Sequence, residues 1–194
     1  MNGYGNSQGR RVLVTGSRGK STIVRLLHTA FRQAGLQSYA RITGVVPREL
    51  GPEGVRAISR SAGAHVGEMR WWLRQIPDAA QCIVMENSAI TPDLQALAGY
   101  WLQPDVTVLS SVMPDHQEVW GPCRDSAVAV LASGIPKNGQ VIVPAGLEQD
   151  DHLMDILDRR RCRVLFAEPV SGADAGYLAG NQALALAAAV HLGL

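Results

Sequence analysis

The stretch RRVLVTGSRGKSTIVRLL, residues 10–27, joins two kinds of hydrophobic pattern through a very short turn. The β-branched run over residues 12–15 is typical of a buried strand, whereas the apolar residues from position 23 onward have helical spacing. The turn between them carries the pattern G-x-x-G-K-S, formed by Gly16, Gly19, Lys20 and Ser21. We therefore expect a strand that bends directly into a helix, with glycine where the backbone must turn.

This turn has the composition of a phosphate-binding loop. Glycines allow successive N–H groups to point inward at a helix N-terminus, where they bind anions. In such a loop Lys20 reaches the β- and γ-phosphates of a nucleotide, and the Ser21 hydroxyl binds Mg²⁺. The spacing departs from G-x-x-x-x-G-K-[ST], because Val14 occupies the place of the first glycine. The motif predicts a shortened phosphate loop; the alternative is a turn that needs glycine only for its geometry, with Lys20 solvated.

Strand-like and helix-like segments alternate along the rest of the chain. This alternation predicts an α/β fold with three layers, in which helices flank a mostly parallel sheet, as in the phosphate-loop NTPases. Residues 44–67 are the least regular part, glycine-rich and basic, and we expect some of them to form a loop. The expected strands are 11–15, 38–43, 81–86, 105–111, 140–144 and 162–167; the expected helices are 20–34, 53–75, 92–102, 123–133, 149–160 and 180–192.

Two later residues are candidate metal ligands, because Mg²⁺ needs hard ligands beyond one serine. Glu86 ends the apolar run CIVM, where a carboxylate is costly unless it is paired or binds a metal. His116 follows the predicted strand 105–111. Both lie after strands, at the edge where open α/β sheets bind ligands. The alternatives are a helix cap or ion pair for Glu86, and a hydrogen-bonded loop residue for His116.

The length of the chain favours one domain over residues 1–194. Hydrophobic residues make up 46% and charged residues 18%, and neither a secretory signal nor a membrane-spanning run is visible, so we expect a cytoplasmic protein.

The two parts of the chain differ in charge. Residues 1–76 hold 12 Lys and Arg against 3 Asp and Glu, whereas residues 77–194 hold 6 Lys and Arg against 14 Asp and Glu. The basic half suits phosphates, an anionic substrate or an acidic partner, or is a solvated face. Few aromatic residues lie among these charges, which argues against nucleic acid.

Four motifs resemble, in order and spacing, the ATPase domain of the Mur ligase superfamily. They are VTGSRGKST, VMENSA, VLSSVMPDHQEVWG and AGNQALALAAAVHLGL. Within that superfamily the chain is most similar to the ligase subunit of poly-γ-glutamate (capsule) synthases. The segment SAGAHVGEM adds to this similarity, since Gly63, Gly67 and Glu68 match a G-x-x-x-G-E pattern.

The resemblance implies a ligase that uses ATP and Mg²⁺. In this family ATP phosphorylates a carboxylate, and an amine then displaces phosphate to form an amide; here the implied substrate is glutamate or a γ-glutamyl chain. Lys20, Glu86 and His116 would be catalytic, and Ser21, Glu86 and His116 would hold the metal. Asn181 would lie near the adenine, and Arg41, Arg48, Arg56 and Arg60 are candidates for holding an anionic polymer. The triphosphate would contact Gly16, Ser17, Arg18, Gly19, Lys20, Ser21 and Thr22.

The sequence also departs from the family pattern. Ser111 replaces an asparagine before the D-H pair, Glu118 replaces an aspartate, and Leu184 replaces a second asparagine of the adenine helix. We expect the C-terminal ligase domain to be absent from these 194 residues, and a partner subunit to supply it or a membrane anchor. Two alternatives stay open: a nucleotide-binding module without its own ligase turnover, and a small phosphate-loop kinase. The short loop together with Glu86 and His116 disfavours the kinase.

Overall fold

An eight-stranded sheet forms the centre of the molecule in a computed structural model, which describes residues 9–44, 46–60, 63–168 and 176–194. The strand order is β4-β3-β2-β5-β1-β6-β7-β8, and only the pairings made by β3 and β4 with their neighbours are antiparallel within these ranges. The prediction of a mostly parallel sheet is therefore confirmed. The strands are β1 (Arg10–Thr15), β2 (Ser38–Ile42), β3 (Arg48–Gly51), β4 (Gly54–Ala57), β5 (Cys82–Glu86), β6 (Val106–Leu109), β7 (Gln140–Pro144) and β8 (Arg163–Ala167).

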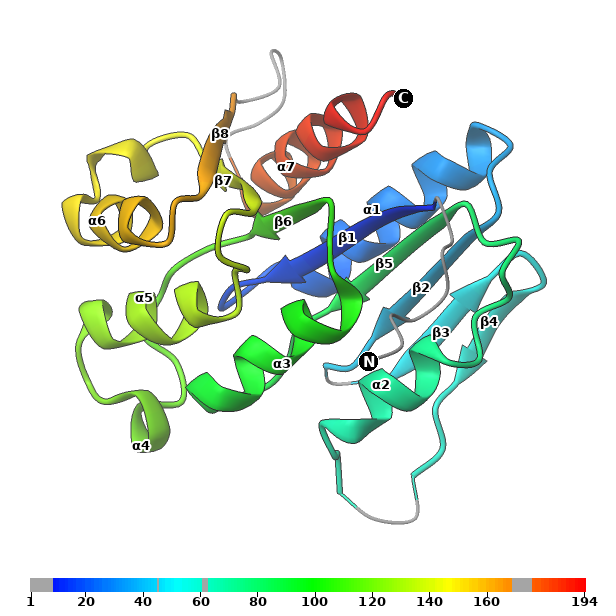
Figure 1. The fold of residues 1–194 in the computed structure, drawn as a ribbon, viewed down its shortest axis with the longest axis horizontal. Helices are drawn as coiled ribbons and strands as arrows, with labels where there is room; N and C mark the ends of the chain where they lie inside the picture. The colour runs from blue at the N-terminus through cyan, green and yellow to red at the C-terminus, as the bar shows by residue number, and fades with distance from the viewer. Residues whose placement is uncertain (1–8, 45, 61–62, 169–175) are drawn as a thin grey trace.

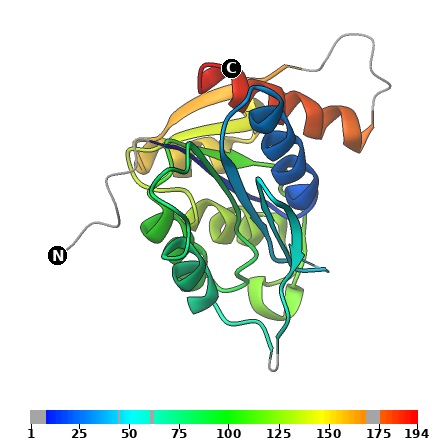
Figure 2. The ribbon, with the colours of Figure 1, turned by 90° about the vertical axis from the view of Figure 1, so that its right-hand side faces the viewer.

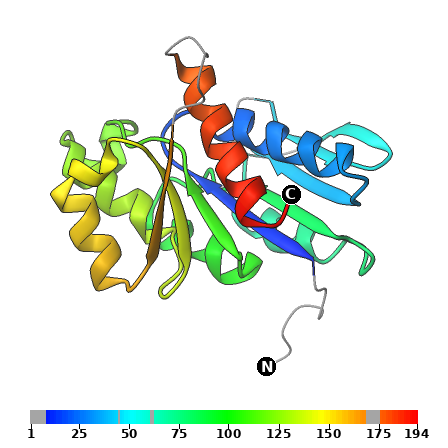
Figure 3. The same ribbon diagram turned by 90° about the horizontal axis from the view of Figure 1, so that it is seen from above.

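Helices cover both faces of the sheet, which gives the three layers expected from the sequence (Figure 1). Figure 3, viewed from above, shows α1 and α7 on one face and α2 and α3 on the other, and Figure 2 shows the same separation from the side. None of the helices in the described ranges has the length and hydrophobicity needed to cross a membrane. The helices are α1 (Lys20–Gln33), α2 (Gly67–Leu73), α3 (Pro92–Leu102), α4 (Gln117–Trp120), α5 (Arg124–Ser133), α6 (Asp151–Arg159) and α7 (Tyr177–His191), with a 3-10 turn at Leu147–Gln149.

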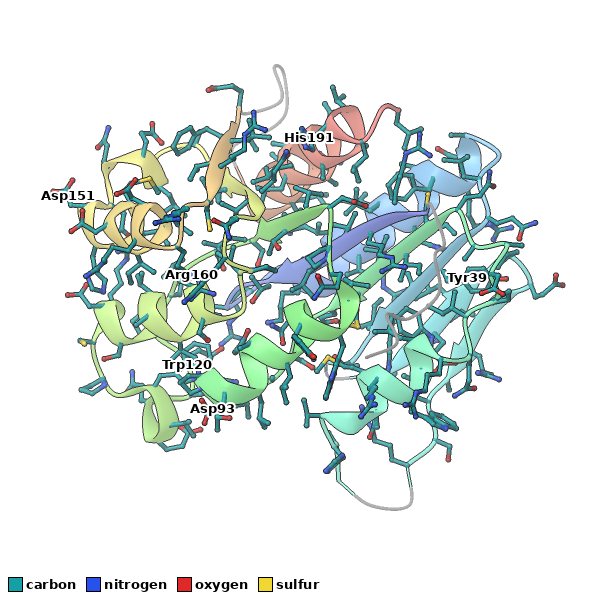
Figure 4. All side chains as sticks on the ribbon, viewed as in Figure 1. Tyr39, Asp93, Trp120, Asp151, Arg160 and His191 are labelled. Atoms are coloured by element: carbon teal, nitrogen blue, oxygen red, sulfur yellow. The ribbon has the colours of Figure 1, made fainter. Side chains whose placement is uncertain are left out.

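The central strands are buried on both faces. Val12 of β1 belongs to the apolar cluster beneath α1 and α7, whereas its neighbour Leu13 belongs to the cluster beneath α2 and α3. A third cluster packs α5 and α6 against β7. Arg160 links these two helices by donating from Nε to the Ile135 carbonyl (3.0 Å), and Figure 4 shows its side chain between them. Burial on both faces explains why the strands read as nearly continuous apolar runs.

The prediction of one helix over residues 53–75 is wrong. Residues 48–57 form the antiparallel pair β3 and β4 instead, and only 67–73 are helical. Gly51 pairs with Gly54 across a turn that contains Pro52 and Glu53. Proline fixes its own φ and removes an N–H, and Gly54 has φ 126°, so this segment turns sharply where a helix would have to continue.

The carboxyl ends of three parallel strands meet at one edge of the sheet. The Cα of Val14 in β1 lies opposite that of Glu86 in β5, and Thr15 lies opposite Leu109 in β6. The segments that follow these strands are therefore neighbours although they are far apart in the sequence. They carry Gly16, Asn87 and Ser110, respectively, as their first residues beyond the strands.

Candidate functional site

The turn between β1 and α1 is built around two glycines that cannot be replaced without strain. Gly16 has φ 128° and Gly19 has φ 85°, both in the region that favours glycine. A Cβ added at Gly16 would lie 2.2 Å from Ser110 Oγ, and one added at Gly19 would lie 2.4 Å from Asn181 Oδ1. The first turn of α1 has no acidic residue and no side-chain cap, so its N-terminus is suited to an anion.

Lys20 places its ammonium group over this turn. Nζ donates to the carbonyl oxygen of Gly16 (2.6 Å) and to that of Ser17 (3.2 Å). Burial lowers the pKa of Lys20, while the nearby carboxylates of Glu86 and Asp115 act to raise it. The expected phosphate loop, residues 16–21, thus carries a partly desolvated cation at its centre.

The segment after β6 supports the outer side of the phosphate loop. The Ser111 hydroxyl accepts from the N–H of Arg18 (3.0 Å), and the Ser111 carbonyl accepts from the N–H of Ser17 (3.0 Å). The Ser17 hydroxyl is in turn fixed by the backbone of Met113, donating to its carbonyl (2.8 Å) and accepting from its N–H (2.9 Å). Serine at position 111 therefore has a structural role in the loop, which sequence reasoning did not identify.

Ser21 and Glu86 come together as the sequence predicts. The Ser21 hydroxyl donates to Glu86 Oε2 (2.9 Å), and the N–H of Thr43 donates to the same oxygen (3.2 Å). Glu86 is 2% exposed, yet neither bond is to a cationic side chain. A Cβ added at Gly44 would lie 3.3 Å from Glu86 Oε1 and 3.5 Å from Ser21 Oγ, so the glycine keeps the space beside both oxygens open.

These oxygens fit a hard divalent cation. A carboxylate and a hydroxyl side by side are the ligand types that Mg²⁺ takes from proteins, together with phosphate oxygens and water. Across the described ranges, no group of three or more His, Cys, Asp or Glu side chains is arranged to hold a metal. A metal at this edge would therefore depend on the Ser21–Glu86 pair and on ligands from outside the chain.

His116 lies on the segment after β6, at the start of α4, with φ 45°. Its Nδ1 is 3.5 Å from Glu118 Oε1, and its ring packs edge-on against Trp120, with centroids 5.3 Å apart. Figure 4 shows Trp120 between α5 and α4, beside the left-hand end of α3. Among the described residues no hydrogen bond joins His116 to Ser21 or Glu86, so its role as a metal ligand stays a prediction. The preceding residue, Asp115, is 3.5 Å from the guanidinium of Arg18.

The remaining predicted residues lie on the helices beside the loop. Thr22 is in the first turn of α1, and Asn181, 8% exposed, packs its side chain against Gly19 from α7. Leu184, which stands where the family has a second asparagine, is 2% exposed in the apolar cluster beneath α7. Asn181 therefore faces the loop from α7, whereas position 184 belongs to the core, and the role of Asn181 near the adenine stays a prediction.

A buried amide pair behind Glu86 is a further part of the site that the sequence did not reveal. Asn87 Nδ2 donates to Gln95 Oε1 (2.6 Å), and Gln95 Nε2 donates to the Ala89 carbonyl (2.6 Å). Thr15 Oγ1 donates to the same Gln95 oxygen (3.2 Å). The pair connects the ends of β1 and β5 to α3 and so fixes the backbone that presents Glu86.

Comparisons with known proteins agree with this architecture. The model of the Mur ligase middle domain matches residues 14–182. A capsule biosynthesis protein, CapB, from Bacillus anthracis is 29% identical over 201 residues, which cover 97% of this chain and 43% of that protein. The PGA synthase CapB of Bacillus subtilis (strain 168) is 29% identical over 163 residues, or 81% of this chain and 41% of that protein. The chain thus spans less than half the length of these relatives.

A solved structure has the same fold at low sequence identity. It is a bifunctional folylpolyglutamate synthase/dihydrofolate synthase, crystallised with Mn, AMPPNP and L-glutamate bound. The TM-score is 0.65 at 16% identity, over 95% of this chain and 54% of that one.

Proposed function

This chain belongs to the Mur ligase middle-domain family, and we propose that it is the nucleotide-binding part of an ATP-dependent ligase that joins a carboxylate to an amine. The observation that carries the proposal is the hydrogen bond between Ser21 and the buried Glu86, beside Lys20 in the phosphate loop. A nucleoside triphosphate requires a cation, a helix N-terminus and a pair of oxygens able to bind a metal, all close together.

The chain's residues would act by holding charge in place. Lys20 and the N–H groups at the start of α1 would stabilise negative charge on the phosphate oxygens. Gly16 and Gly19 allow the backbone to lie close to Ser110 and Asn181, and Ser111 keeps the loop in that shape. Mg²⁺, held by Ser21 and Glu86 with His116 as a further candidate ligand, would neutralise phosphate charge.

In the proposed reaction, a carboxylate oxygen of the substrate attacks the γ-phosphorus of ATP. The bond from that phosphorus to the β–γ bridging oxygen breaks, and ADP leaves with the electron pair. An amine then attacks the acyl carbon, phosphate leaves, and the amine loses a proton to give the amide. This chain would supply the groups for the first step, because Lys20, Ser21 and Glu86 all lie at the phosphate loop.

We further propose that the substrate is glutamate or a γ-glutamyl chain. The name of the Bacillus subtilis relative, a PGA (poly-γ-glutamate) synthase, supports this substrate, and so does the glutamate bound in the folylpolyglutamate synthase structure. The excess of basic residues in the first 76 positions is compatible with an anionic chain.

The test is a trapping experiment with the purified chain. Mg²⁺-ATP, a γ-glutamyl peptide and hydroxylamine are mixed under single-turnover conditions, and the hydroxamate formed from an acyl phosphate is measured by mass spectrometry. Hydroxamate that requires both ATP and the peptide supports the proposal. Nucleotide binding without hydroxamate would favour the module that lacks its own turnover, and phosphate on a stable hydroxyl product would favour a kinase.

A further inference from the structure

A second charged site lies on the other face of the sheet, next to α2. A cavity of about 240 Å³ opens between β2, β3 and α2, and we call it the arginine cavity. The residues that line it include two arginines, two glutamates and an exposed tryptophan. Its principal lining residues are Arg41, Glu49, Ser59, Arg60, Glu68 and Trp71.

Arg41 is the unusual member of this group. Its side chain is 2% exposed, and Nη2 donates to Glu68 Oε2 (2.7 Å). Its Nε and Nη1 atoms are buried and have no hydrogen-bond partner among the residues that the structure describes. Buried guanidinium nitrogens without acceptors are costly, and structures seldom leave them so. Arg41 thus belongs to the cavity wall and carries two buried donor nitrogens that lack an acceptor in the described part of the chain.

The surrounding charges leave an excess of positive charge. Arg60 also binds Glu68, through Nε to Oε1 (3.0 Å) and Nη2 to Oε2 (2.8 Å), so one carboxylate is shared by two guanidinium groups. Glu49, the other carboxylate of the wall, is paired with Arg56. Arg56 is outside the cavity wall but neutralises Glu49, so the cluster as a whole holds three guanidinium groups and two carboxylates, and one added carboxylate would balance its net charge.

The cavity lies near the strand ends that carry the phosphate loop, but it opens on the opposite face of the sheet. Arg41 lies opposite Met85 in the β2–β5 pairing, one position before Glu86. Two residues after Arg41, Thr43 donates its N–H to Glu86. A long anionic chain that reaches the phosphate loop over this edge would pass the arginine cavity.

We propose that the arginine cavity binds a carboxylate of the γ-glutamyl chain, at a glutamyl residue other than the one that reacts. The inference rests on the proposed function for its substrate class. The guanidinium groups match a carboxylate or a phosphate in hydrogen bonding. The single excess charge and the two glutamates of the wall favour a monoanion, because a phosphate dianion would meet repulsion from Glu49 and Glu68.

The test compares two arginine variants in the chain saturated with Mg²⁺-AMPPNP. Arg60→Gln removes a half-buried guanidinium of the cavity, and Arg25→Gln makes the same charge change on α1, on the opposite face. The Kd of a γ-glutamyl tripeptide, measured by calorimetry, should rise about tenfold in the first variant and stay unchanged in the second. A tripeptide whose α-carboxylates are converted to amides should not bind.

A second measurement uses the unmodified protein, so it does not depend on a variant folding. The NMR signal of Arg41 Nε–H should shift when the tripeptide binds and stay in place when inorganic phosphate is added. Equal tripeptide affinity for wild type and Arg60→Gln, equal binding of the amide, or a matching shift with phosphate would overturn the inference. Failure of wild type to bind Mg²⁺-AMPPNP would instead count against the proposed function, since Arg60 plays no part in the nucleotide site.

Discussion

At the scale of single residues, burial determines the pKa and the hydrogen-bond acceptors of Lys20. Burial lowers its pKa, and its present acceptors are the carbonyl oxygens of Gly16 and Ser17. Neutral carbonyls compensate a buried ammonium less than an anion would. Phosphate oxygens would therefore be better acceptors, and the electrostatic environment of Lys20 favours their binding.

Lys20→Ala is expected to raise the Kd for Mg²⁺-AMPPNP at least about tenfold and to lower ATP-dependent turnover about a hundredfold, because it removes the charge that faces the phosphates. Calorimetry measures the first effect and phosphate release the second. Lys137→Ala, which removes the chain's other lysine from an exposed turn, is the matched control. Similar affinities for the two variants would exclude Lys20 from the nucleotide site.

Glu86→Gln tests the metal site while preserving the shape of the side chain. A carboxamide is a weaker ligand for Mg²⁺ than a carboxylate, so the Mg²⁺ concentration that half-saturates nucleotide binding should rise about tenfold. Glu148→Gln neutralises an exposed carboxylate in the 3-10 turn at Leu147–Gln149 and serves as the control. A magnesium titration that is identical in wild type and Glu86→Gln would remove Glu86 from the set of metal ligands.

At the scale of elements, the contact between the phosphate loop and α7 depends on a missing side chain. Asn181 reaches Gly19 so closely that a Cβ there would overlap it, and Gly19 also has a positive φ. Gly19→Ala should lower the free energy of unfolding by about 1–2 kcal/mol and weaken nucleotide binding, because loop and α7 must separate. Urea denaturation and calorimetry measure the two effects.

Gly180→Ala supplies the matched control for this prediction. Gly180 is exposed in α7, directly before Asn181, with no atoms within 4 Å of an added Cβ. Alanine is the better helix former, so this change should raise the free energy of unfolding by about 0.5–1 kcal/mol and leave nucleotide binding unchanged. If both variants bind nucleotide like wild type, the close approach of α7 to the loop is irrelevant to the ligand.

The strands differ in how well the sequence predicts them. β1 and β5 were predictable because both faces are buried, so their residues form unbroken apolar runs. β4 was mistaken for helix because all of its residues are exposed, and no burial pattern marks it as a strand. The turn Gly51-Pro52-Glu53-Gly54 was the available signal, since it breaks a helix and closes a hairpin.

The contacts of the candidate site also differ in how well the sequence predicts them. Ser21 and Glu86 were predictable as neighbours because parallel strands deliver their carboxyl ends to one edge. The bonds of Ser111 to Arg18 and of Arg41 to Glu68 were not, since each depends on how a loop or a short helix packs after the sheet has formed. An arginine inside an apolar strand indicates a buried partner but does not identify it.

At the scale of the whole molecule, the two ends of the sheet come from the two parts of the chain that carry opposite net charge. β4, β3 and β2 form one end of the sheet and come from the basic first part of the chain, whereas β6, β7 and β8 form the other end and come from the acidic part (Figure 1). The phosphate loop follows β1, which lies between them. Anionic ligands would therefore approach preferentially over the end that carries the arginine cavity.

Global stability should also depend on pH through His28. This residue of α1 is 5% exposed, its Nδ1 is 3.0 Å from Ser38 Oγ in β2, and it packs in the layer that covers the sheet. Burial, assisted by the charge of Arg32, lowers the pKa of His28 from 6.5 to about 4. Between pH 6.5 and about 4, His28 is protonated in the unfolded chain and neutral in the folded chain. The free energy of unfolding therefore falls as the pH falls through this range.

The loss attributable to His28 should reach about 2–3 kcal/mol near pH 4, and it should disappear about one pH unit above 6.5, where the imidazole is neutral in both states. Urea denaturation of wild type and His28→Gln measures it, since glutamine keeps a hydrogen-bonding group for Ser38 but does not titrate. Glu68, whose pKa is lowered from 4.5 mainly by its bond to Arg60 against the opposing effect of burial, adds an acid-dependent loss that is common to both proteins and cancels in the difference. Parallel stability curves for the two proteins between pH 4 and 6.5 would mean that His28 is protonated in the folded state, and that the packing of α1 on β2 tolerates its charge.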